Sequence, residues 1–506
     1  MKNLDTCLRM LLSVTCLLTG SLCSQPVSAQ DAAAVFAAFE QAVVDTVSRA
    51  EKSIVAVARI PLRNEKIDRQ QSRHPFGPPR NFDGSDPLSP DFVPQEFGTG
   101  ILMSQPGKPE TRFVLTNYHV VDGGQPFLND GSVISDARLT VRLDRTHVAW
   151  ASIYAADPRS DLAVLAIDGE QLGTALTERP TLPLPETVEF RKGQFVLALG
   201  NPYAVARDGS PSVSSGMISN VSRYPLVDTR GGEKTIHQFG TLLHVDTRLG
   251  PGFSGGALLN SSGQFIGITT SLAALEGYES SVGYAIPFSD SMRRIVEELL
   301  SGQEVEYGFL GVQVIEPVGR RFNNVRVQNP QGVFIKVVVP DSPADRAGLR
   351  SGETIRAVNG VRLYSQDDLF REVGLLRPGS NANIQVISRE GQRFVDVRIA
   401  KWPVTDPDRI IVSQYRQPAW RGLRVDWPTG RMKFFDFEAA YPIAVVAKTV
   451  EPGSPAEAAG LRPGDLIDRV AGRSVETPEE FAAAVKSLRG NVRLNLTDGE
   501  AVTIQP

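Results

Sequence analysis

Ser254 lies in the segment LGPGFSGGALLN (residues 249–260), with four glycines around it and an apolar run directly after it. A serine hydroxyl acts as a nucleophile when a base lies within hydrogen-bond reach and a third group orients that base. The alternative is a glycine-rich bend in which the serine has no chemical role. The rest of the chain decides between the two, because only a nucleophile needs partners.

The candidate bases are histidines. The chain has five of them: His74, His119, His147, His237 and His244. His119 closes the apolar run FVLTNYHVV, where a rigid strand-like segment meets a turn, although a histidine in such a place is more often part of a core. We interpret His74, His147 and His237 as surface residues because of their polar or turn-rich surroundings. His244, in TLLHVDT, is interpreted as a core or ligand-wall residue.

Asp161, in DPRSDLAVLAI, is the candidate third group. It opens an apolar run typical of a buried strand, where a carboxylate without a partner is costly. The N–H of an imidazole is a suitable partner for it. His119, Asp161 and Ser254 follow one another at separations of 42 and 93 residues.

The elements around these residues are predicted to be short and mainly β. Between residues 97 and 287, apolar and β-branched runs are broken by Gly, Pro, Asn and Asp, which is typical of an all-β barrel or sandwich. Helix-like segments lie at 31–52 and 288–302. The polar segment 62–96 has too few apolar residues to order itself, and we interpret it as a mobile insertion, either regulatory or merely solvated.

The second half of the chain contains an internal repeat. DSPADRAGLRSGETIRAVNG (341–360) matches GSPAEAAGLRPGDLIDRVAG (453–472). At a constant offset of 112, Ser342, Gly348, Gly352 and Gly360 recur as Ser454, Gly460, Gly464 and Gly472. Two copies of one small domain are therefore expected. Each copy continues into a predicted helix with an N-cap and an acidic N3 residue, Ser365 with Asp368 and Thr477 with Glu480.

Length, composition and charge limit the possible classes. At roughly 150 residues per domain, 506 residues suggest about three domains. With 41% hydrophobic and 22% charged residues, the chain is expected to be neither disordered nor a membrane bundle. The net charge of −4 leaves no basic excess for phosphates, so we expect no nucleic-acid partner.

The N-terminus has the pattern of a secretory signal. Lys2 and Arg9 precede an apolar stretch from Met10 to Leu22, and the small residues Val27 and Ala29 follow. We expect cleavage after Ala29 and export to the periplasm or the extracellular space, with an uncleaved anchor as the alternative. All three cysteines lie before this site, so the mature chain would contain no thiol.

Taken together, TNYHVV, SDLAVL and GFSGGAL, in the order His, Asp, Ser, resemble the chymotrypsin-like serine proteases, and more narrowly the exported HtrA (Deg) proteases. The motifs GNP (200–202), SSGMIS (214–219) and VGYAIP (282–287) resemble the same family, and the repeats resemble its PDZ domains. The resemblance implies a mainly β fold, with a chymotrypsin-like double β-barrel followed by two α+β PDZ domains. It divides the chain into a signal peptide (1–29), a protease domain (30–303, with the insertion at 62–96), PDZ domain 1 (304–403) and PDZ domain 2 (412–506).

The resemblance also implies roles. Ser254 would attack the scissile carbonyl, His119 would take and return the proton, and Asp161 would orient the imidazole. The backbone N–H groups of Gly252 and Ser254 would form the oxyanion hole. Phe253 stands where the family usually has Asn and zymogens have Asp, so activation by a new N-terminal amine is not expected. Packing, neighbouring loops or oligomer contacts must order the loop instead.

Substrate recognition is expected at two places. In the resemblance, the specificity pocket would be lined by Leu249, Thr269, Thr270 and Ser271 and would favour small or medium apolar side chains. Arg248 stands where trypsin-like enzymes carry an acid, which does not support cleavage after Lys or Arg.

The PDZ repeats would bind C-terminal peptides. The carboxylate loop of the first repeat would be FLGV, which is Phe309, Leu310, Gly311 and Val312. The corresponding WRGL (420–423) of the second repeat has Arg421 at a usually apolar position, so the first repeat is the better candidate.

No metal or cofactor motif is present, and we expect neither. The resemblance implies an ATP-independent endopeptidase for unfolded or damaged proteins, assembled as a trimer or a multiple of trimers. Two alternatives stay open: a proteolytically idle chaperone or peptide-binding scaffold, and a processing protease that cuts one partner docked on a PDZ domain.

Overall fold

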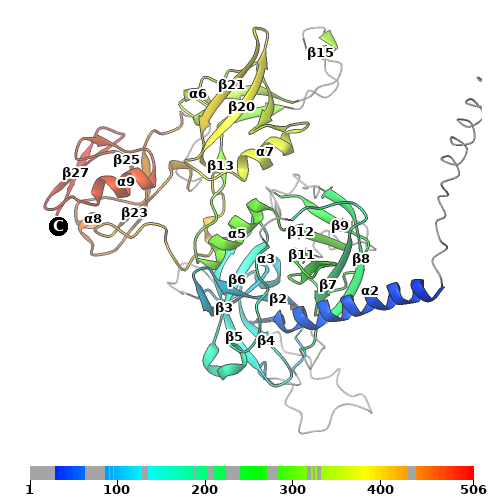
Figure 1. Ribbon diagram of the computed structural model, residues 1–506. Coiled ribbons are helices and arrows are strands. Elements are labelled where there is room, and N and C mark those ends of the chain that lie inside the picture. The colour runs from blue at the N-terminus through cyan, green and yellow to red at the C-terminus, as the bar shows by residue number, and fades with distance from the viewer. Residues whose placement is uncertain are drawn as a thin grey trace, which may run out of the picture. The chain divides into compact units, whose positions relative to one another are not determined.

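The computed structural model describes residues 29–62, 86–89, 92–94, 96–127, 135–185, 188–201, 209–223, 240–270, 283–315, 321–322, 325–326, 332–430 and 440–506. The expected signal segment and most of the 62–96 insertion lie outside the described residues. Within them strands predominate, as the sequence predicts (Figure 1).

Helix α2 (Ala29–Ala50) is the predicted N-terminal helix, and its eight alanines favour that conformation. Most of α2 belongs to a unit of residues 1–49, and the rest of the chain, residues 50–506, forms a second unit. A 3-10 turn, η1 (Glu51–Ser53), follows α2. Among the described residues, no helix combines the length and the apolar character needed to cross a membrane.

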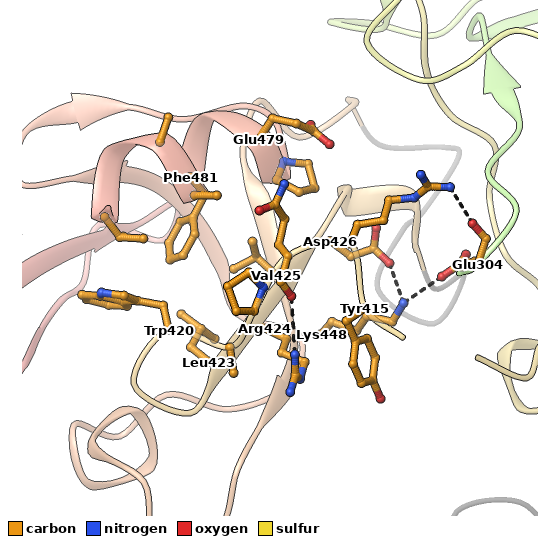
Figure 2. Close-up of a pocket in the computed structure, with 18 of the residues that line it drawn as sticks. Glu304, Tyr415, Trp420, Leu423, Arg424, Val425, Asp426, Lys448, Glu479 and Phe481 are labelled. Carbon is orange, nitrogen blue, oxygen red and sulfur yellow. Dashed lines mark hydrogen bonds and ion pairs between the residues drawn. The ribbon is translucent and has the colours of Figure 1, made fainter. Parts of the chain in front are cut away.

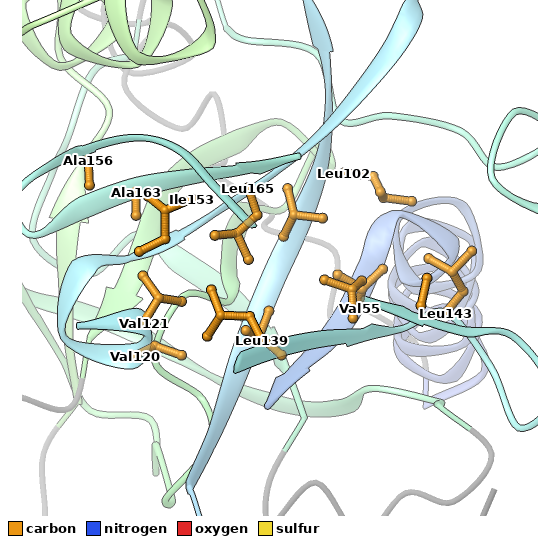
Figure 3. Close-up of a cluster of buried hydrophobic side chains, with 14 of the residues drawn as sticks. Val55, Leu102, Val120, Val121, Leu139, Leu143, Ile153, Ala156, Ala163 and Leu165 are labelled. Atoms are coloured by element: carbon orange, nitrogen blue, oxygen red, sulfur yellow. The ribbon is translucent and has the colours of Figure 1, made fainter. Parts of the chain in front are cut away.

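The first six strands close into a barrel. They are β1 (Ile54–Pro61), β2 (Glu96–Gln105), β3 (Lys108–Asn117), β4 (Ala137–Arg142), β5 (Val148–Asp157) and β6 (Leu162–Ile167). They pair antiparallel in the order β1-β2-β3-β6-β5-β4. Apolar side chains fill the interior, and Figure 3 shows Leu139, Ile153 and Leu165 among those gathered between the strands. The short turns η2 (Gly169–Gln171) and η3 (Gly173–Ala175) follow β6.

A second closed barrel also has six strands. Its strands are β7 (Phe195–Gly200), β8 (Ser212–Arg223), β9 (Leu242–Val245), β10 (Ala257–Asn260), β11 (Phe265–Thr270) and β12 (Gly283–Pro287), in the order β10-β11-β12-β9-β8-β7. The predicted closing helix is α5 (Asp290–Leu300), and the Ser289 hydroxyl accepts a hydrogen bond from the Met292 N–H at its N-terminus. Two six-stranded barrels define a chymotrypsin-like fold, which decides between the barrel and the sandwich left open by the strand pattern.

The internal repeat forms two sheets of identical order. The first has β14 (Val312–Ile315), β17 (Val333–Val338), β18 (Thr354–Val358), β20 (Asn381–Ser388) and β21 (Gly391–Arg398), with β19 (Val361–Arg362) beside β18. The second has β23 (Leu423–Asp426), β24 (Val445–Val450), β25 (Leu466–Val470), β27 (Val492–Leu496) and β28 (Ala501–Ile504), with β26 (Arg473–Ser474) beside β25. Equal order in both copies is what the repeated sequence predicts.

Each repeat also carries two helices at matching places. They are α6 (Pro343–Arg346) and α7 (Gln366–Gly374) in the first copy, and α8 (Pro455–Ala458) and α9 (Pro478–Val485) in the second. Ser365 and Asp368 form the predicted capping box, and the Thr477 hydroxyl accepts from the Glu480 N–H. The remaining short pieces are β13 (Gly308–Phe309), β22 (Ala400–Lys401), β15 (Arg321–Phe322), β16 (Val325–Arg326), η5 (Pro407–Arg409) and η6 (Pro428–Gly430).

Candidate active site

The pairing of β3 with β6 places His119 beside Asp161. The last residue of β3, Asn117, lies opposite the first residue of β6, Leu162. His119 follows β3 in the one-turn helix α3 (Tyr118–Val121), and Asp161 directly precedes β6. The Tyr118 N–H donates to the Asp161 carbonyl at 2.9 Å, so the two strand ends are joined at this point.

The Asp161 carboxylate contacts both the ring and the backbone N–H of His119. The ring Nδ1 lies 2.9 Å from Oδ2 and 3.0 Å from Oδ1, and the His119 backbone N–H donates to Oδ1 at 2.9 Å. The side chain of Asp161 is 1% exposed, and that of His119 is 18% exposed. A carboxylate on Nδ1 makes that nitrogen the donor, which leaves Nε2 as the acceptor for a proton.

Asp161 adopts a left-handed backbone conformation, with φ of 55°. Such a conformation costs about 1–3 kcal/mol for a residue other than glycine, although Asp tolerates it better than most. Surrounding structure must therefore hold the turn from Asp157 to Asp161 in place. This turn is called the Asp161 turn below.

The pKa of His119 is raised above its ordinary value. Burial lowers this pKa, but the Asp161 carboxylate, its hydrogen bond to the ring and the more distant charge of Asp122 outweigh burial. Asp122 follows α3 and accepts a hydrogen bond from the Tyr118 hydroxyl at 2.5 Å. Asp122 stands three residues after His119 in HVVDGG, but no sequence motif marks it as a functional residue.

The raised pKa predicts the acid limb of activity. His119 accepts a proton only when neutral, so kcat/KM should rise with pH through a pKa above about 6.5. Asp122→Asn removes one charge that raises this pKa, and the limb should move to lower pH by roughly half a unit. A pH profile of peptide hydrolysis measures the shift. Asp168→Asn, at an exposed site beyond the other end of β6, is the control and should leave the limb in place; equal limbs for all three proteins would contradict the role given to Asp122.

The loop around Ser254 is anchored to the first barrel by Thr99 on β2. The Thr99 N–H donates to the Ser254 carbonyl at 2.8 Å, and its hydroxyl donates to the Gly252 carbonyl at 2.6 Å. The same hydroxyl accepts from the Asn201 N–H at 2.7 Å. Thr99 is fully buried, so these bonds have no competition from water.

Two glycines are required by the shape of this loop. Gly252 has φ of 93° and Gly255 has φ of 85°, both in the left-handed region. A Cβ on Gly255 would lie 2.1 Å from the Thr99 carbonyl oxygen and 2.4 Å from the Thr116 hydroxyl.

The Ser254 loop and the His119 turn meet around β2. The Thr116 hydroxyl, three residues before His119, donates to the Thr99 carbonyl at 2.7 Å. A Cβ on Gly98 would lie 2.7 Å from the Val120 side chain and 3.1 Å from the Ser254 carbonyl oxygen. The structure therefore brings His119 into contact with Asp161, and brings the backbone of Ser254 to the same part of β2 as the His119 turn.

Phe253 is a core residue of the second barrel. Its side chain is 5% exposed and belongs to a cluster with Val196 and Leu258. Its carbonyl accepts from the Thr269 hydroxyl at 2.5 Å and from the Gly256 N–H at 2.9 Å. In this loop Phe253 is therefore held by packing in the core of the second barrel and by a hydrogen bond from β11.

The expected pocket residues have different surroundings. Leu249 is partly buried against the core of the second barrel. Thr269 and Thr270 are buried on β11, and the Thr269 hydroxyl is engaged by the Phe253 carbonyl. Ser271 lies outside the described residues.

The two other histidines among the described residues, His147 and His244, each contact a neighbouring side chain. His147 pairs with Asp144, with Nδ1 2.8 Å from Oδ1, at a partly exposed site. His244 on β9 stacks on Tyr284, with ring centroids 5.5 Å apart. His74 and His237 lie outside the described residues.

The carboxylate loop of the first PDZ repeat is tightly packed. Phe309 is 5% exposed, and its ring lies 6.1 Å from the rings of both Trp402 and Tyr441, measured between centroids. Gly311 has φ of 85°, and a Cβ there would lie 2.3 Å from the Cβ of Ser342.

A groove of about 540 Å³ lies between β23 and α9 of the second repeat, and Glu304, Glu306 and Lys401 also line it. Figure 2 shows Trp420 and Phe481 at one end and Asp426, Lys448 and Glu304 at the other. Arg421 does not line it: its guanidinium lies 4.7 Å from the Trp420 ring centroid and donates to the Ile504 carbonyl. The sequence favours the first repeat as the peptide site, and this stays a prediction.

Comparison with known proteins defines the class. Residues 98–268 match the trypsin-like peptidase domain, and residues 334–386 and 446–497 each match the PDZ domain. The chain is thus a trypsin-like serine peptidase with two PDZ domains.

Relatives over most of the chain define the family. A protein named probable periplasmic serine endoprotease DegP-like, from Chlamydia trachomatis, is 30% identical over 430 residues, which cover 84% of this chain and 77% of the relative. A protein of the same name from Pseudomonas putida is 28% identical over 477 residues, which cover 89% of this chain and 90% of the relative. The solved structure of the HtrA-type protease AlgW with a decapeptide is 24% identical, with a TM-score of 0.48, over 71% of this chain and 99% of that one. The chain belongs to the family of DegP-like serine endoproteases.

Proposed function

We propose that Ser254, His119 and Asp161 are the catalytic triad of this endopeptidase. The observation that carries the proposal is the contact of the buried Asp161 carboxylate with both the ring and the backbone of His119. In this mechanism the Ser254 hydroxyl attacks the scissile carbonyl while His119 Nε2 takes its proton. The protonated imidazole, stabilised by Asp161, then returns the proton to the leaving amine.

The oxyanion of the tetrahedral intermediate is assigned to the backbone N–H groups of Gly252 and Ser254. Thr99 supports this assignment because its hydroxyl holds the Gly252 carbonyl, which fixes the plane of the neighbouring peptide units. Burial of Phe253, which lies between Gly252 and Ser254, also supports the oxyanion-hole assignment. Leu249 and the threonines of β11 are assigned to the specificity pocket.

The proposed substrates are unfolded or damaged polypeptides, cleaved without ATP. C-terminal peptides are assigned to the PDZ repeats, which we place at 304–403 and 412–506. The groove between β23 and α9 supports a peptide site in the second repeat, because an extended peptide adds to a strand edge beside a helix. The loop Phe309–Val312 is retained as the carboxylate loop of the first repeat.

The mature protein is proposed to begin after Ala29 and to act in the periplasm, the compartment in the names of the relatives. Assembly into trimers or their multiples is proposed through the N-terminal helix. Val35 and Phe36 of α2 support this assembly, since their side chains are 69% and 67% exposed.

Covalent labelling of the nucleophile tests the triad. A fluorophosphonate should add to Ser254 of the mature protein, because the reagent reacts only with a serine activated by its base. Mass spectrometry of the labelled peptide locates the adduct, and Ser254→Ala should carry none. An unlabelled native protein that still bound peptides would support the idle scaffold instead. A labelled protein that cut a denatured substrate such as casein at only one or two sites would support the processing protease.

A further inference from the structure

The Asp161 turn is held by residues that lie outside the two barrels. It begins at Asp157, which is fully buried at the end of β5. One carboxylate oxygen of Asp157 accepts from Arg159 Nε at 2.7 Å. The other accepts from the Ser160 N–H at 3.2 Å and from the hydroxyl of Tyr307, which lies beyond α5 in the segment that leads into the first PDZ repeat.

Tyr307 is buried and is contacted through both its ring and its backbone. It is 1% exposed, and the Arg159 guanidinium lies 4.5 Å from its ring centroid. Arg159 also donates to the Val305 carbonyl at 2.7 Å, and the Trp402 N–H donates to the Tyr307 carbonyl at 2.6 Å. Burial, followed by the charge of Asp157, raises the pKa of Tyr307 well above its ordinary value, so its hydroxyl remains a neutral donor.

The strand end before the turn is held in a similar way. Ile411, in the segment between the two PDZ repeats, forms an isolated antiparallel bridge with Ala156. The Ala156 N–H donates to the Ile411 carbonyl at 2.9 Å, and the Ile411 N–H donates back at 3.1 Å. The Ile411 side chain is 8% exposed and belongs to the core cluster of the first barrel. Ala156 is thus hydrogen-bonded to the segment after the first PDZ repeat, and Asp157 is hydrogen-bonded to Tyr307 near the start of that repeat.

Asp161 needs this support because its left-handed backbone conformation is unfavourable for a residue other than glycine. We propose that Tyr307 is a positioning residue for catalysis, which holds the Asp161 turn, and with it the Asp161 carboxylate, from the entrance of the first PDZ repeat. The role rests on the proposed triad.

The full mature protein carrying Tyr307→Phe tests this role. The substitution keeps the ring beneath Arg159 and removes one donor from the buried Asp157 carboxylate. We expect kcat to fall roughly 5- to 20-fold at constant KM, because the loss is in orientation and not in substrate binding. The acid limb should move to lower pH by roughly half a unit, since Asp161 raises the pKa of His119 and a looser carboxylate raises it less. Global destabilisation alone would not move that limb.

Two further variants sharpen the test. Tyr154→Phe changes a buried tyrosine on β5, whose ring stacks on Phe113 with centroids 4.4 Å apart, and should leave kcat and the limb unchanged. In an Asp157→Asn background, Tyr307→Phe should add little, because the two groups act through one bond.

The outcomes separate this role from the triad itself. A wild-type protein that labels at Ser254, together with unchanged kinetics of Tyr307→Phe, would overturn only the role of Tyr307. A drop in activity that matched a drop in folded protein by circular dichroism, with an unmoved acid limb, would also overturn it. Failure of the wild type to label would overturn the triad and this role with it.

Discussion

Asp161→Asn should lower kcat about 10⁴-fold and leave the fold intact, by analogy with the same change in other Ser-His-Asp enzymes. The carboxylate accepts from both the ring Nδ1–H and the backbone N–H of His119. An amide nitrogen facing the ring would instead require Nδ1 as an acceptor, which moves the proton to Nε2. His119 would then be unable to take the Ser254 proton, and kcat for peptide hydrolysis measures the loss.

The chain offers a matched control for this prediction. Asp144 contacts the ring of His147 with nearly the same geometry, at 2.8 and 2.9 Å from Nδ1, but at a partly exposed site. Asp144→Asn should therefore leave kcat unchanged. Retention of more than a tenth of the wild-type kcat by Asp161→Asn would show that Asp161 is not the orienting group.

Thr99→Val is expected to lower kcat roughly 100-fold, the effect typical of losing one oxyanion-hole donor. The substitution keeps the shape of the side chain but removes the bond to the Gly252 carbonyl and the acceptor for the Asn201 N–H. Both groups are then left buried without that partner, at a cost of about 1–3 kcal/mol in stability. Initial rates and thermal unfolding of the variant measure the two effects.

Two control variants test whether the Thr99 hydroxyl causes this effect. Thr99→Ser retains the hydroxyl and should recover most of the activity. Thr140→Val removes a hydroxyl from a threonine of β4 that is 4% exposed, and should change neither kcat nor KM. Equal loss in Thr99→Ser and Thr99→Val would indicate that the methyl group, and not the hydroxyl, supports the loop.

The sequence predicts much of this molecule because several of its patterns are local. Strand periodicity and turn residues predicted the β-rich protease region, and the 112-residue repeat predicted two equal sheets. His119 and Asp161 were found because each stands at the end of an apolar run, and the register of β3 against β6 brings such ends together.

Other parts of the site had no local pattern. Thr99 lies in EFGTGILM, where nothing marks it as the anchor of a loop 150 residues further along the chain. Tyr307 and Ile411 stand in connecting segments, and an isolated aromatic or aliphatic residue there is typical of any linker. Phe253 was singled out only because it stands where the family usually has Asn and zymogens have Asp. Its burial depends on packing against strands that are distant in sequence.

The first PDZ repeat is attached to the first barrel at both ends of its sequence, at Tyr307 near its start and at Ile411 just after its end. A force applied to either end of this repeat is therefore transmitted to the same two residues, 156 and 157. The covalent order of the domains understates how closely the first repeat is joined to the protease domain.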